Sequence, residues 1–351
     1  MGELPEKTAN PELPTVSAVI PAYNAADTIE RALNSVYAQT YENIIEVIVV
    51  DDGSTDDTAQ IVRDKFPDVI LIQQENGGNA AARNTGIAAA TGEYLAFLDA
   101  DDEWLPEKTE VQVGVMEDLP GAAICLCKQI HVMPNGDIVA RGTRGGGVRQ
   151  YVFRDWLGMG QAAWGESYDG CVSAWLCRAT CLEAVGGFDP RLRQCVDTEM
   201  LTRMTGLGYV VIGSPQRHFR RYLQTKSVSQ GAAAELRKAF LWYRILQRYS
   251  PGRGCWRGRL LSEYEFMSLC RERLRTMGYA LIYDGNYHSG VRALRKARRT
   301  GGGSHFQRMK TAMGIACPAV LRLYGSTFLQ RSRASLVRSF HHCTRDGRAD
   351  R

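Results

Sequence analysis

Residues 92–102 read GEYLAFLDADD and join an apolar run to a cluster of acids. Residues 94–98 are apolar or aromatic without alternation, which is typical of a parallel strand that is covered on both faces. Asp99, Asp101 and Asp102 follow where such a strand would end. Neighbouring carboxylates repel one another unless a positive charge lies between them. We therefore expect a buried strand whose carboxyl end carries a functional loop.

The chain before residue 92 repeats the same alternation of apolar runs and amphipathic segments. The patterns predict strands at 16–20, 44–50 and 69–72, and helices at 25–39, 55–66 and 79–90. A βαβαβαβ order predicts an α/β fold with a mostly parallel, Rossmann-like sheet and helices on both faces. Ligands of such sheets bind outside the carboxyl ends of the strands, so the loops at those ends are the expected site.

Three of the four strand-end loops are polar: residues 21–24, 51–56 and 99–102. Turn and capping preferences of Asp, Asn, Ser and Gly explain part of this composition. They do not explain the doublets Asp51-Asp52 and Asp101-Asp102. Mg²⁺ and Mn²⁺ prefer oxygen ligands and often take one or two carboxylates together with phosphate oxygens. A metal at the last of these loops would neutralise a diphosphate leaving group.

Beyond residue 106 the pattern is less regular. It predicts strands at 121–127, 137–140, 173–177 and 209–212, and short helices at 179–185 and 198–207. Later helices are expected at 232–249, 257–278, 286–299, 306–323 and 327–340. Acidic and basic residues are unevenly distributed along the chain. Residues 1–234 hold 19 Lys and Arg against 31 Asp and Glu, and residues 235–351 hold 24 Lys and Arg against 7 Asp and Glu. An acidic first part and a basic last third predict two different roles.

Four segments carry a resemblance to a known family: VIPAYN (19–24), VVDDGSTD (49–56), NGGNAAARNTG (76–86) and GEYLAFLDADD (92–102). With these segments in order, the chain resembles the family 2 glycosyltransferases, which are inverting enzymes with a GT-A fold. A weaker match continues in GGFD (186–189) and in DTE (197–199). The resemblance covers roughly residues 15–230. It implies an N-terminal extension (1–14), a GT-A domain (15–230) and a basic helical C-terminal region (231–351). The GT-A domain would comprise a nucleotide-binding half (15–105) and an acceptor half (106–230).

The resemblance implies a role for each matching position. The residues expected to bind the nucleotide are Pro21, Tyr23, Asn24, Asp51, Asp52, Asn76, Arg83 and Asp99. Within this set, Asp51 or Asp52 would hydrogen-bond the base, Arg83 would lie near the base and phosphates, and Asp99 would face the ribose.

The metal and the base are implied in the same way. Asp101, with Asp102 beside it, would hold Mg²⁺ or Mn²⁺. Asp197 would be the catalytic base, although Val196 stands where the family commonly has the Glu of a Glu-Asp pair, so Glu199 is a second candidate. Direct displacement needs one base and a stabilised leaving group, and it needs no protein nucleophile.

The implied activity is a metal-dependent hexosyltransferase reaction. It would move a sugar from a nucleoside-diphosphate sugar, with UDP as the default nucleotide, to a hydroxyl of a glycan or lipid-linked glycan in surface polysaccharide synthesis. One alternative is a non-catalytic module that binds nucleotide sugars or docks on a membrane. Another is a sugar-nucleotide pyrophosphorylase, which needs a Gly-rich, basic loop after the first strand. Residues 21–24 have neither feature.

Several residues have two interpretations. Gly77-Gly78 either lets a backbone approach a phosphate or makes a turn, and Arg83 is either a phosphate partner or a solvated surface charge. Residues 218–222, expected after the last strand, either close over a diphosphate or form a basic surface loop. Trp104 and Trp175 are expected in the core. The ten cysteines are expected to be reduced and mostly buried.

The composition, 44% hydrophobic and 23% charged over 351 residues, excludes disordered and fibrous classes. No apolar run reaches the roughly 18–20 residues that a membrane-spanning helix needs, and residues 1–14 lack the pattern of a signal peptide. The basic C-terminal region is expected to be solvated or to dock on anionic lipid, whereas no motif favours nucleic acid. We expect a cytoplasmic protein, either free or peripheral on the inner face of the membrane.

Overall fold

The computed structural model describes residues 10–139, 151–153, 170–192, 195–223, 255–256 and 259–260, and in the C-terminal part residues 271, 274–275, 278–279, 282 and 287–299. The chain divides into two compact units. The first comprises residues 1–227 and 245–261, and the second comprises residues 228–244 and 262–351. The division into functional domains stays a prediction.

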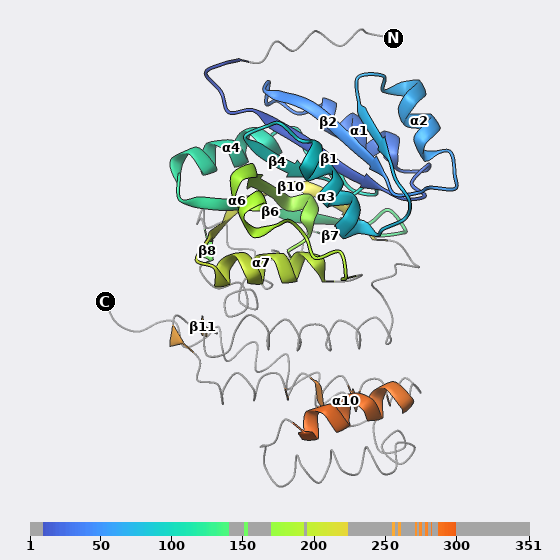
Figure 1. Cartoon of the computed structure of the whole chain (residues 1–351), viewed down its shortest axis with the longest axis vertical. Helices are drawn as coiled ribbons and strands as arrows, with labels where there is room; N and C mark the ends of the chain where they lie inside the picture. The colour runs from blue at the N-terminus through green and yellow to red at the C-terminus, as the bar shows by residue number, and fades with distance from the viewer. Residues whose placement is uncertain are drawn as a thin grey trace. The chain divides into compact units, whose positions relative to one another are not determined.

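The first hundred residues form the alternating pattern that the sequence predicts (Figure 1). The strands are β1 (Val16–Ala22), β2 (Ile44–Asp51), β3 (Ile70–Gln73) and β4 (Tyr94–Phe97), and the helices between them are α1 (Ile29–Tyr37), α2 (Thr58–Lys65) and α3 (Asn79–Ala89). The four strands pair in parallel in the order β3-β2-β1-β4. β1 is buried at every position because it is paired on both edges. Its last residue, Ala22, is level with Asp51 of β2, so the polar loops meet at one edge of the sheet.

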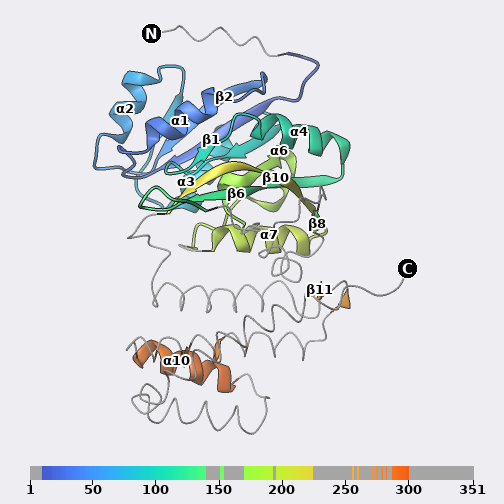
Figure 2. The same cartoon turned by 180° about the vertical axis from the view of Figure 1, so that it is seen from behind.

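The second part extends the same sheet with mixed pairing. Its elements are β5 (Glu103–Trp104), α4 (Lys108–Asp118), β6 (Ala122–Val132), β7 (Ile138–Val139), β8 (Tyr151–Phe153), η1 (Val172–Ala174), β9 (Trp175–Arg178), α6 (Ala179–Val185), α7 (Val196–Gly206) and β10 (Val210–Tyr222). β9 lies antiparallel between β4 and β6, and β10 runs parallel to β6. Figure 2 shows β6 and β10 of this part from behind.

Two expected strands differ in extent from those observed. The strand expected at 173–177 begins at Trp175, because residues 172–174 form a single 3₁₀ turn. The strand expected at 209–212 continues to Tyr222 as β10. Its register against β6 shifts between Gly213 and Arg217, around Pro215. A bulge is where a sheet accepts proline, so the proline interrupts the ladder without ending the strand.

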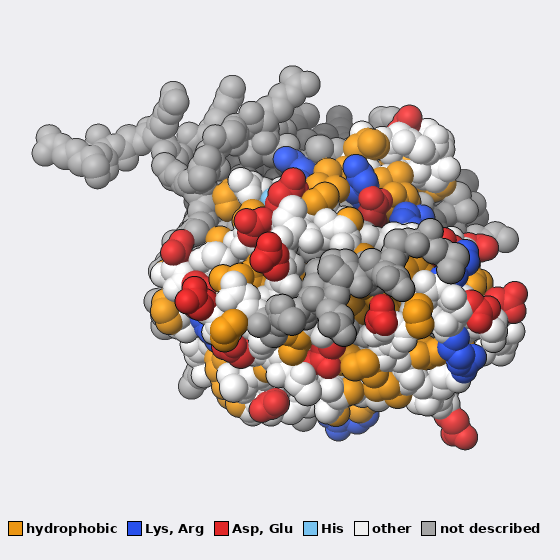
Figure 3. Space-filling model, turned by 90° about the horizontal axis from the view of Figure 1, so that it is seen from above, with side chains coloured by type: hydrophobic (Ala, Val, Ile, Leu, Met, Phe, Trp, Pro, Cys, Tyr) orange, Lys and Arg blue, Asp and Glu red, His pale blue; other side chains and the backbone are white. Residues whose placement is uncertain are grey.

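Large aromatic side chains fill the core of the first unit, as expected for Trp104 and Trp175. Both are nearly inaccessible to solvent, and their indole N–H groups donate to the carbonyl oxygens of Ser173 and Gly170, each at 3.0 Å. Six of the described cysteines are free thiols, and four of these six are buried. Acidic side chains are spread over the face shown in Figure 3, in line with the charge of the first part.

The described part of the second unit includes α10 (Tyr287–Arg299), close to the helix expected at 286–299. β11 (Cys255–Trp256) and β12 (Arg259–Leu260) pair as a hairpin, so the helix expected from residue 257 was wrong at its start. The helices expected at 232–249, 306–323 and 327–340 lie outside the described residues. Within the part of the chain that the structure describes, no helix has the length and apolarity to cross a bilayer.

Candidate functional site

The loops after β1 and β2 are fixed to each other by hydrogen bonds. Asn24 has a left-handed backbone (φ 49°), and its side-chain Oδ1 accepts from the Thr55 N–H at 2.8 Å. Its own N–H donates to Ser54 Oγ at 2.9 Å. Pro21 is buried in β1, whereas Tyr23 is half exposed at the rim. This arrangement leaves the Tyr23 ring free to contact a ligand.

Asp51 and Asp52 are both buried, and both have protein donors. Asp51 accepts from the Ser54 N–H and from the side chain of Gln73, each at 3.0 Å. Asp52 accepts from the Gln74 side chain at 2.7 Å and from the N–H groups of Gly77 and Gly78 at 2.8 and 2.7 Å.

These bonds show that Gly77-Gly78 makes a turn, because both N–H groups are directed at Asp52. Gly78 has φ +88°, which few residues other than glycine adopt. Asn76, on the same turn, is exposed. The turn therefore lies where Asn76 can reach a ligand while Asp52 holds the backbone.

Arg83 of α3 forms an ion pair with Asp99 at the carboxyl end of β4. Only 2% of the residue is exposed, so the interpretation as a solvated surface charge was wrong. Its Nη1 and Nε atoms are buried without a hydrogen-bond partner among the described residues. The guanidinium carbon lies 5.5 Å from the ring centroid of Phe188. A buried cation with unpaired donors next to a solvent-accessible carboxylate suits an anionic ligand.

Asp102 is buried beneath the loop after β4. Its Oδ2 accepts from Ser173 Oγ at 2.6 Å, and its Oδ1 accepts from the Tyr222 N–H at 3.3 Å. Burial raises the pKa of Asp102 well above its ordinary value, and the charges of Asp101 and Asp99 raise it further. Burial and the charge of Asp99 also raise the pKa of Asp101. The loop concentrates negative charge that a cation would stabilise.

Three side chains of this loop region could hold a metal. Ligand atoms of Asp99, Asp102 and Cys171 all lie within 4.8 Å of one another. Asp101 is not in this group, although it was the expected ligand, and Asp99 takes its place. Two carboxylates fit Mg²⁺ or Mn²⁺, whereas a thiol is a softer ligand than these ions prefer. The two carboxylates therefore fit a divalent cation, with Cys171 as the atypical member.

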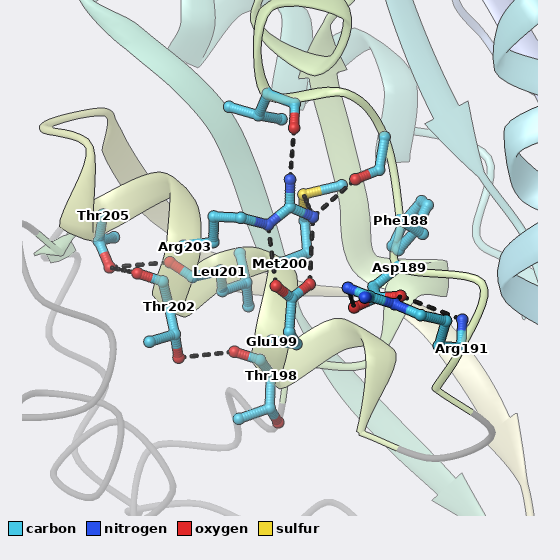
Figure 4. Close-up of polar contacts among 12 residues, drawn as sticks. Phe188, Asp189, Arg191, Thr198, Glu199, Met200, Leu201, Thr202, Arg203 and Thr205 are labelled. Atoms are coloured by element: carbon cyan, nitrogen blue, oxygen red, sulfur yellow. Dashed lines mark hydrogen bonds and ion pairs between the residues drawn. The ribbon is translucent and has the colours of Figure 1, made fainter. Parts of the chain in front are cut away.

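The two candidate bases have different surroundings on α7. Asp197 is partly buried in the first turn, next to the left-handed residue Cys195. Glu199 is buried and pairs with Arg203, whose Nε and Nη2 lie 2.8 and 3.1 Å from its two oxygens (Figure 4). A base must reach the acceptor proton. The ion pair with Arg203 gives Glu199 a structural role, and the choice of Asp197 as the base stays a prediction.

Residues 218–222 lie within β10, so the interpretation as a surface loop after the last strand was wrong, while a contact with the diphosphate stays a prediction. Arg220 pairs with Glu103 at 2.6 Å, and the hydroxyl of Tyr222 donates to the same carboxylate at 2.6 Å. Arg31 of α1 stacks over the Tyr222 ring at 3.7 Å and donates to the carbonyl oxygen of Asp101 at 2.6 Å. These contacts connect the acidic loop after β4 to α1 and β10.

Sequence reasoning missed Ser173, which links two of the aspartates. Its hydroxyl accepts from the Asp99 N–H at 3.1 Å and donates to Asp102. No local pattern marks a serine more than seventy positions from its partners. It missed Cys171 for the same reason.

A comparison with protein families decides the class of this domain. Residues 17–174 match the family described as glycosyl transferase family 2. This part of the chain is a family 2 glycosyltransferase domain.

Curated relatives agree over about a third of the chain. An uncharacterized glycosyltransferase of Nostoc sp. is 47% identical over 106 residues, which is 29% of this chain and 33% of the relative. Glycosyltransferase AglE of Haloferax volcanii is 43% identical over 122 residues, covering 32% and 40%. WfaP of Escherichia coli, a UDP-Glc:alpha-D-GlcNAc-diphosphoundecaprenol beta-1,3-glucosyltransferase, is 46% identical over 105 residues, covering 29% and 41%. The matches thus span less than half the length of each relative.

Solved structures agree over a larger part of the chain. S. aureus TarS 1–349 in complex with UDP superposes with a TM-score of 0.55 at 19% identity, covering 88% of this chain and 89% of that one. The complex of the same protein with UDP-GlcNAc gives 0.56 at 20% identity, covering 82% and 81%. At these identities the likeness shows the fold, which is the GT-A fold.

Proposed function

We propose that this protein is an inverting glycosyltransferase that uses a nucleoside-diphosphate sugar, with UDP as the nucleotide. One observation carries the proposal: Arg83, Asp99 and Asp102 converge at the carboxyl end of β4 in a family 2 domain. A cation next to paired carboxylates suits a ligand that brings both phosphate charge and a metal. The TarS complexes hold UDP and UDP-GlcNAc in the same fold, which supports UDP as the first nucleotide to test.

In this proposal the strand-end loops divide the work of binding the donor. Tyr23 and Asn76 reach the nucleotide from the exposed rim, and Asn24, Asp51 and Asp52 fix the loops behind them. The unpaired donors of Arg83 bind a phosphate oxygen.

The residues that would hold Mg²⁺ or Mn²⁺ are Asp99, Asp102 and Cys171, with Asp101 beside them. A bound ion would supply charge stabilisation to the diphosphate leaving group. Ser173 and the backbone of Tyr222 keep the Asp102 carboxylate oriented toward this position.

Asp197 is the proposed base, because Glu199 is engaged by Arg203. It takes the proton of the acceptor hydroxyl while the hydroxyl oxygen attacks the anomeric carbon and the nucleoside diphosphate leaves. The single displacement inverts the configuration at that carbon. No covalent sugar–protein intermediate is needed.

The acceptor proposed here is a lipid-linked glycan of surface polysaccharide synthesis. WfaP, by its name, acts on a sugar carried by diphosphoundecaprenol, and it is 46% identical to this chain over 105 residues. The C-terminal region adds a second argument, because residues 285–345 contain no Asp or Glu and 12 Lys or Arg. On α10, Arg295, Arg298 and Arg299 are exposed, whereas Leu294 and Ala297 are buried. This face suits an electrostatic contact with anionic lipid on the inner face of the membrane.

The experiment has two parts. Calorimetric titration with UDP, ADP and GDP, with and without Mn²⁺, measures the preferred nucleotide and the effect of the ion. A transfer assay then uses UDP-glucose and a synthetic α-GlcNAc-diphosphoundecaprenol acceptor, and other UDP-sugars in turn. Metal-enhanced UDP binding with product formation supports the proposal. Binding without turnover across the donors favours the non-catalytic module. Release of diphosphate from UTP and a sugar phosphate favours the pyrophosphorylase.

A further inference from the structure

Adjacent residues of α3 contact two different halves of the fold. Arg83 pairs with Asp99 on the donor side, as described above. Asn84 contacts the turn that joins α6 to α7: its Nδ2 donates to the carbonyl oxygen of Phe188 at 2.8 Å, and the Phe188 N–H donates to its Oδ1 at 2.8 Å. One side chain therefore satisfies both backbone groups of a residue 104 positions away.

The turn is tightly packed at this contact. Gly187 has φ +67°, and a Cβ atom there would lie 2.5 Å from Asn84 Oδ1, which is closer than real Cβ contacts come. Phe188 is 1% exposed, with its ring edge-on to Phe97 of β4 and stacked on Trp175 of β9, both at 5.8 Å between centroids. Small displacements at this position are therefore transmitted to neighbouring elements.

α7 holds the same turn from its other side. The Nη1 and Nη2 atoms of Arg203 donate to the carbonyl oxygens of Val185 and Gly187 at 2.5 and 2.6 Å, and Glu199 fixes the orientation of the guanidinium (Figure 4). The turn is thus clamped between Asn84 of α3 and Arg203 of α7. The side chains of Asn84 and Arg203 are not among the donor contacts described above, although the Phe188 ring of the turn lies 5.5 Å from the Arg83 guanidinium.

We propose that Asn84, Gly187 and Arg203 form a joint that positions α7, and with it Asp197, relative to the donor site. The inference rests on the proposed function, in which Asp197 is the base. All three are positioning residues, because they act through α7 and not on the substrate. Placement matters because a misplacement of about 1 Å in a reacting group can lower a rate about hundredfold.

The first test separates turnover from donor binding. We expect Asn84→Ala and Arg203→Met each to lower kcat for UDP-glucose at least about tenfold, while the Kd for UDP with Mn²⁺ changes less than about twofold. If the two residues act through one joint, the losses in the double variant will be smaller than the product of the single losses. Asn34→Ala, on the exposed side of α1, is the matched control and should retain wild-type kcat and Kd.

The second test does not depend on activity. Hydrogen exchange is measured on the whole chain at a temperature well below the Tm of each variant. Asn84→Ala should speed exchange of the backbone amides of residues 186–206 and leave β1, β2 and β4 at the wild-type rate. Gly187→Ala should reproduce this pattern, because it forces the same contact apart from the other side.

The outcomes distinguish the two proposals. Unchanged exchange in α7 together with unchanged kcat in Asn84→Ala would overturn the joint. Faster exchange throughout the first unit, with loss of UDP binding, would also overturn it, because Asn84 would then be a general stability residue. A wild-type protein that transfers no sugar would count against the proposed function, while the exchange data would still decide whether α3 positions α7.

Discussion

Lys108 of α4 carries an amine into the core of the first unit, and its removal should stabilise the protein. The residue has no solvent exposure. Its Nζ lies 4.1 Å from the ring centroid of Trp104 and 3.4 Å from the carbonyl oxygen of Trp175. Within the described part of the chain, no carboxylate forms an ion pair with it. Burial lowers the pKa of Lys108 from 10.5 to about 8.

The pKa difference sets the magnitude. Because one pKa unit corresponds to about 1.4 kcal/mol, the charged amine costs the fold about 3 kcal/mol at pH 7. The contact with Trp104 offsets about 1 kcal/mol of that cost. Lys108→Met should therefore raise the free energy of unfolding by about 1–3 kcal/mol at pH 7, since methionine fills a similar volume without the charge.

The sign of the pH dependence follows from the lowered pKa. Between pH 8 and 10.5 the unfolded chain binds more protons at this lysine than the folded chain does, so wild-type stability rises with pH through that window. Lys108→Met lacks this contribution. The advantage of the variant should thus be constant below about pH 7 and should shrink toward pH 10.5.

Urea unfolding of both proteins between pH 6 and 10.5 measures the difference directly, and titration of other groups cancels in the subtraction. Lys65→Met on α2 is the control, because Lys65 is half exposed and its pair with Glu30 is solvated. A variant that is less stable than wild type at pH 7, or an advantage that does not change with pH, would refute the reasoning.

Three further predictions address the site and the basic face. Asp102→Asn should abolish the gain in UDP affinity that Mn²⁺ gives, while the affinity for UDP without metal stays within about threefold of wild type, both measured by calorimetry. A Mn²⁺ effect that persists in this variant would contradict the metal assignment. Arg83→Met should weaken UDP binding at least about tenfold and lower the free energy of unfolding by about 1–3 kcal/mol, because it removes the buried partner of Asp99. The control variant Arg63→Met on α2 should change neither quantity. Substitution of Arg295, Arg298 and Arg299 by Glu should reduce cosedimentation with phosphatidylglycerol vesicles at least about tenfold at 0.1 M salt, and it should not change binding to neutral vesicles. The reason is that each basic residue near an anionic membrane surface contributes about 1 kcal/mol of binding free energy. Equal binding of wild type to both vesicle types would argue against the membrane contact.

The donor half of the fold could be predicted because its signals are local. The apolar runs of β1, β2 and β4 lie between amphipathic helices, and a parallel order then brings their ends to one edge. β10 was predicted short because a bulge around Pro215 breaks the alternation that marks a strand, and only the pairing with β6 carries the chain through it. Such pairing involves residues far apart in sequence, which no local pattern shows.

For the site as well, contacts between residues close in sequence could be predicted, and contacts between distant residues could not. That Arg83 and Asp99 belong to one site followed from the motifs, but the Phe188 ring that lies 5.5 Å from the Arg83 guanidinium comes from the acceptor half, which no motif shows. Glu199 was named as the second candidate base because its pairing with Arg203, one helical turn away, has a spacing that is also common on solvated helix faces. The sequence contains the pair but not the buried turn that Arg203 contacts.

The two aspartate doublets show that charge repulsion alone does not predict which loop binds a metal. Both doublets were expected to need a positive charge nearby. Asp51 and Asp52 obtain their stabilisation from five N–H donors of the protein, three of them backbone groups, so this doublet needs no ion. Asp101 and Asp102 lie in the same type of strand-end loop, yet burial raises the pKa of both, and the charge of Asp99 raises both further. The first doublet accepts from three backbone N–H groups, two of them from Gly77 and Gly78, whereas Asp102 in the second accepts from the Ser173 hydroxyl and from the Tyr222 N–H. A metal is therefore expected only after β4, and the first doublet is expected to remain bound to the turn whether or not the ion is present.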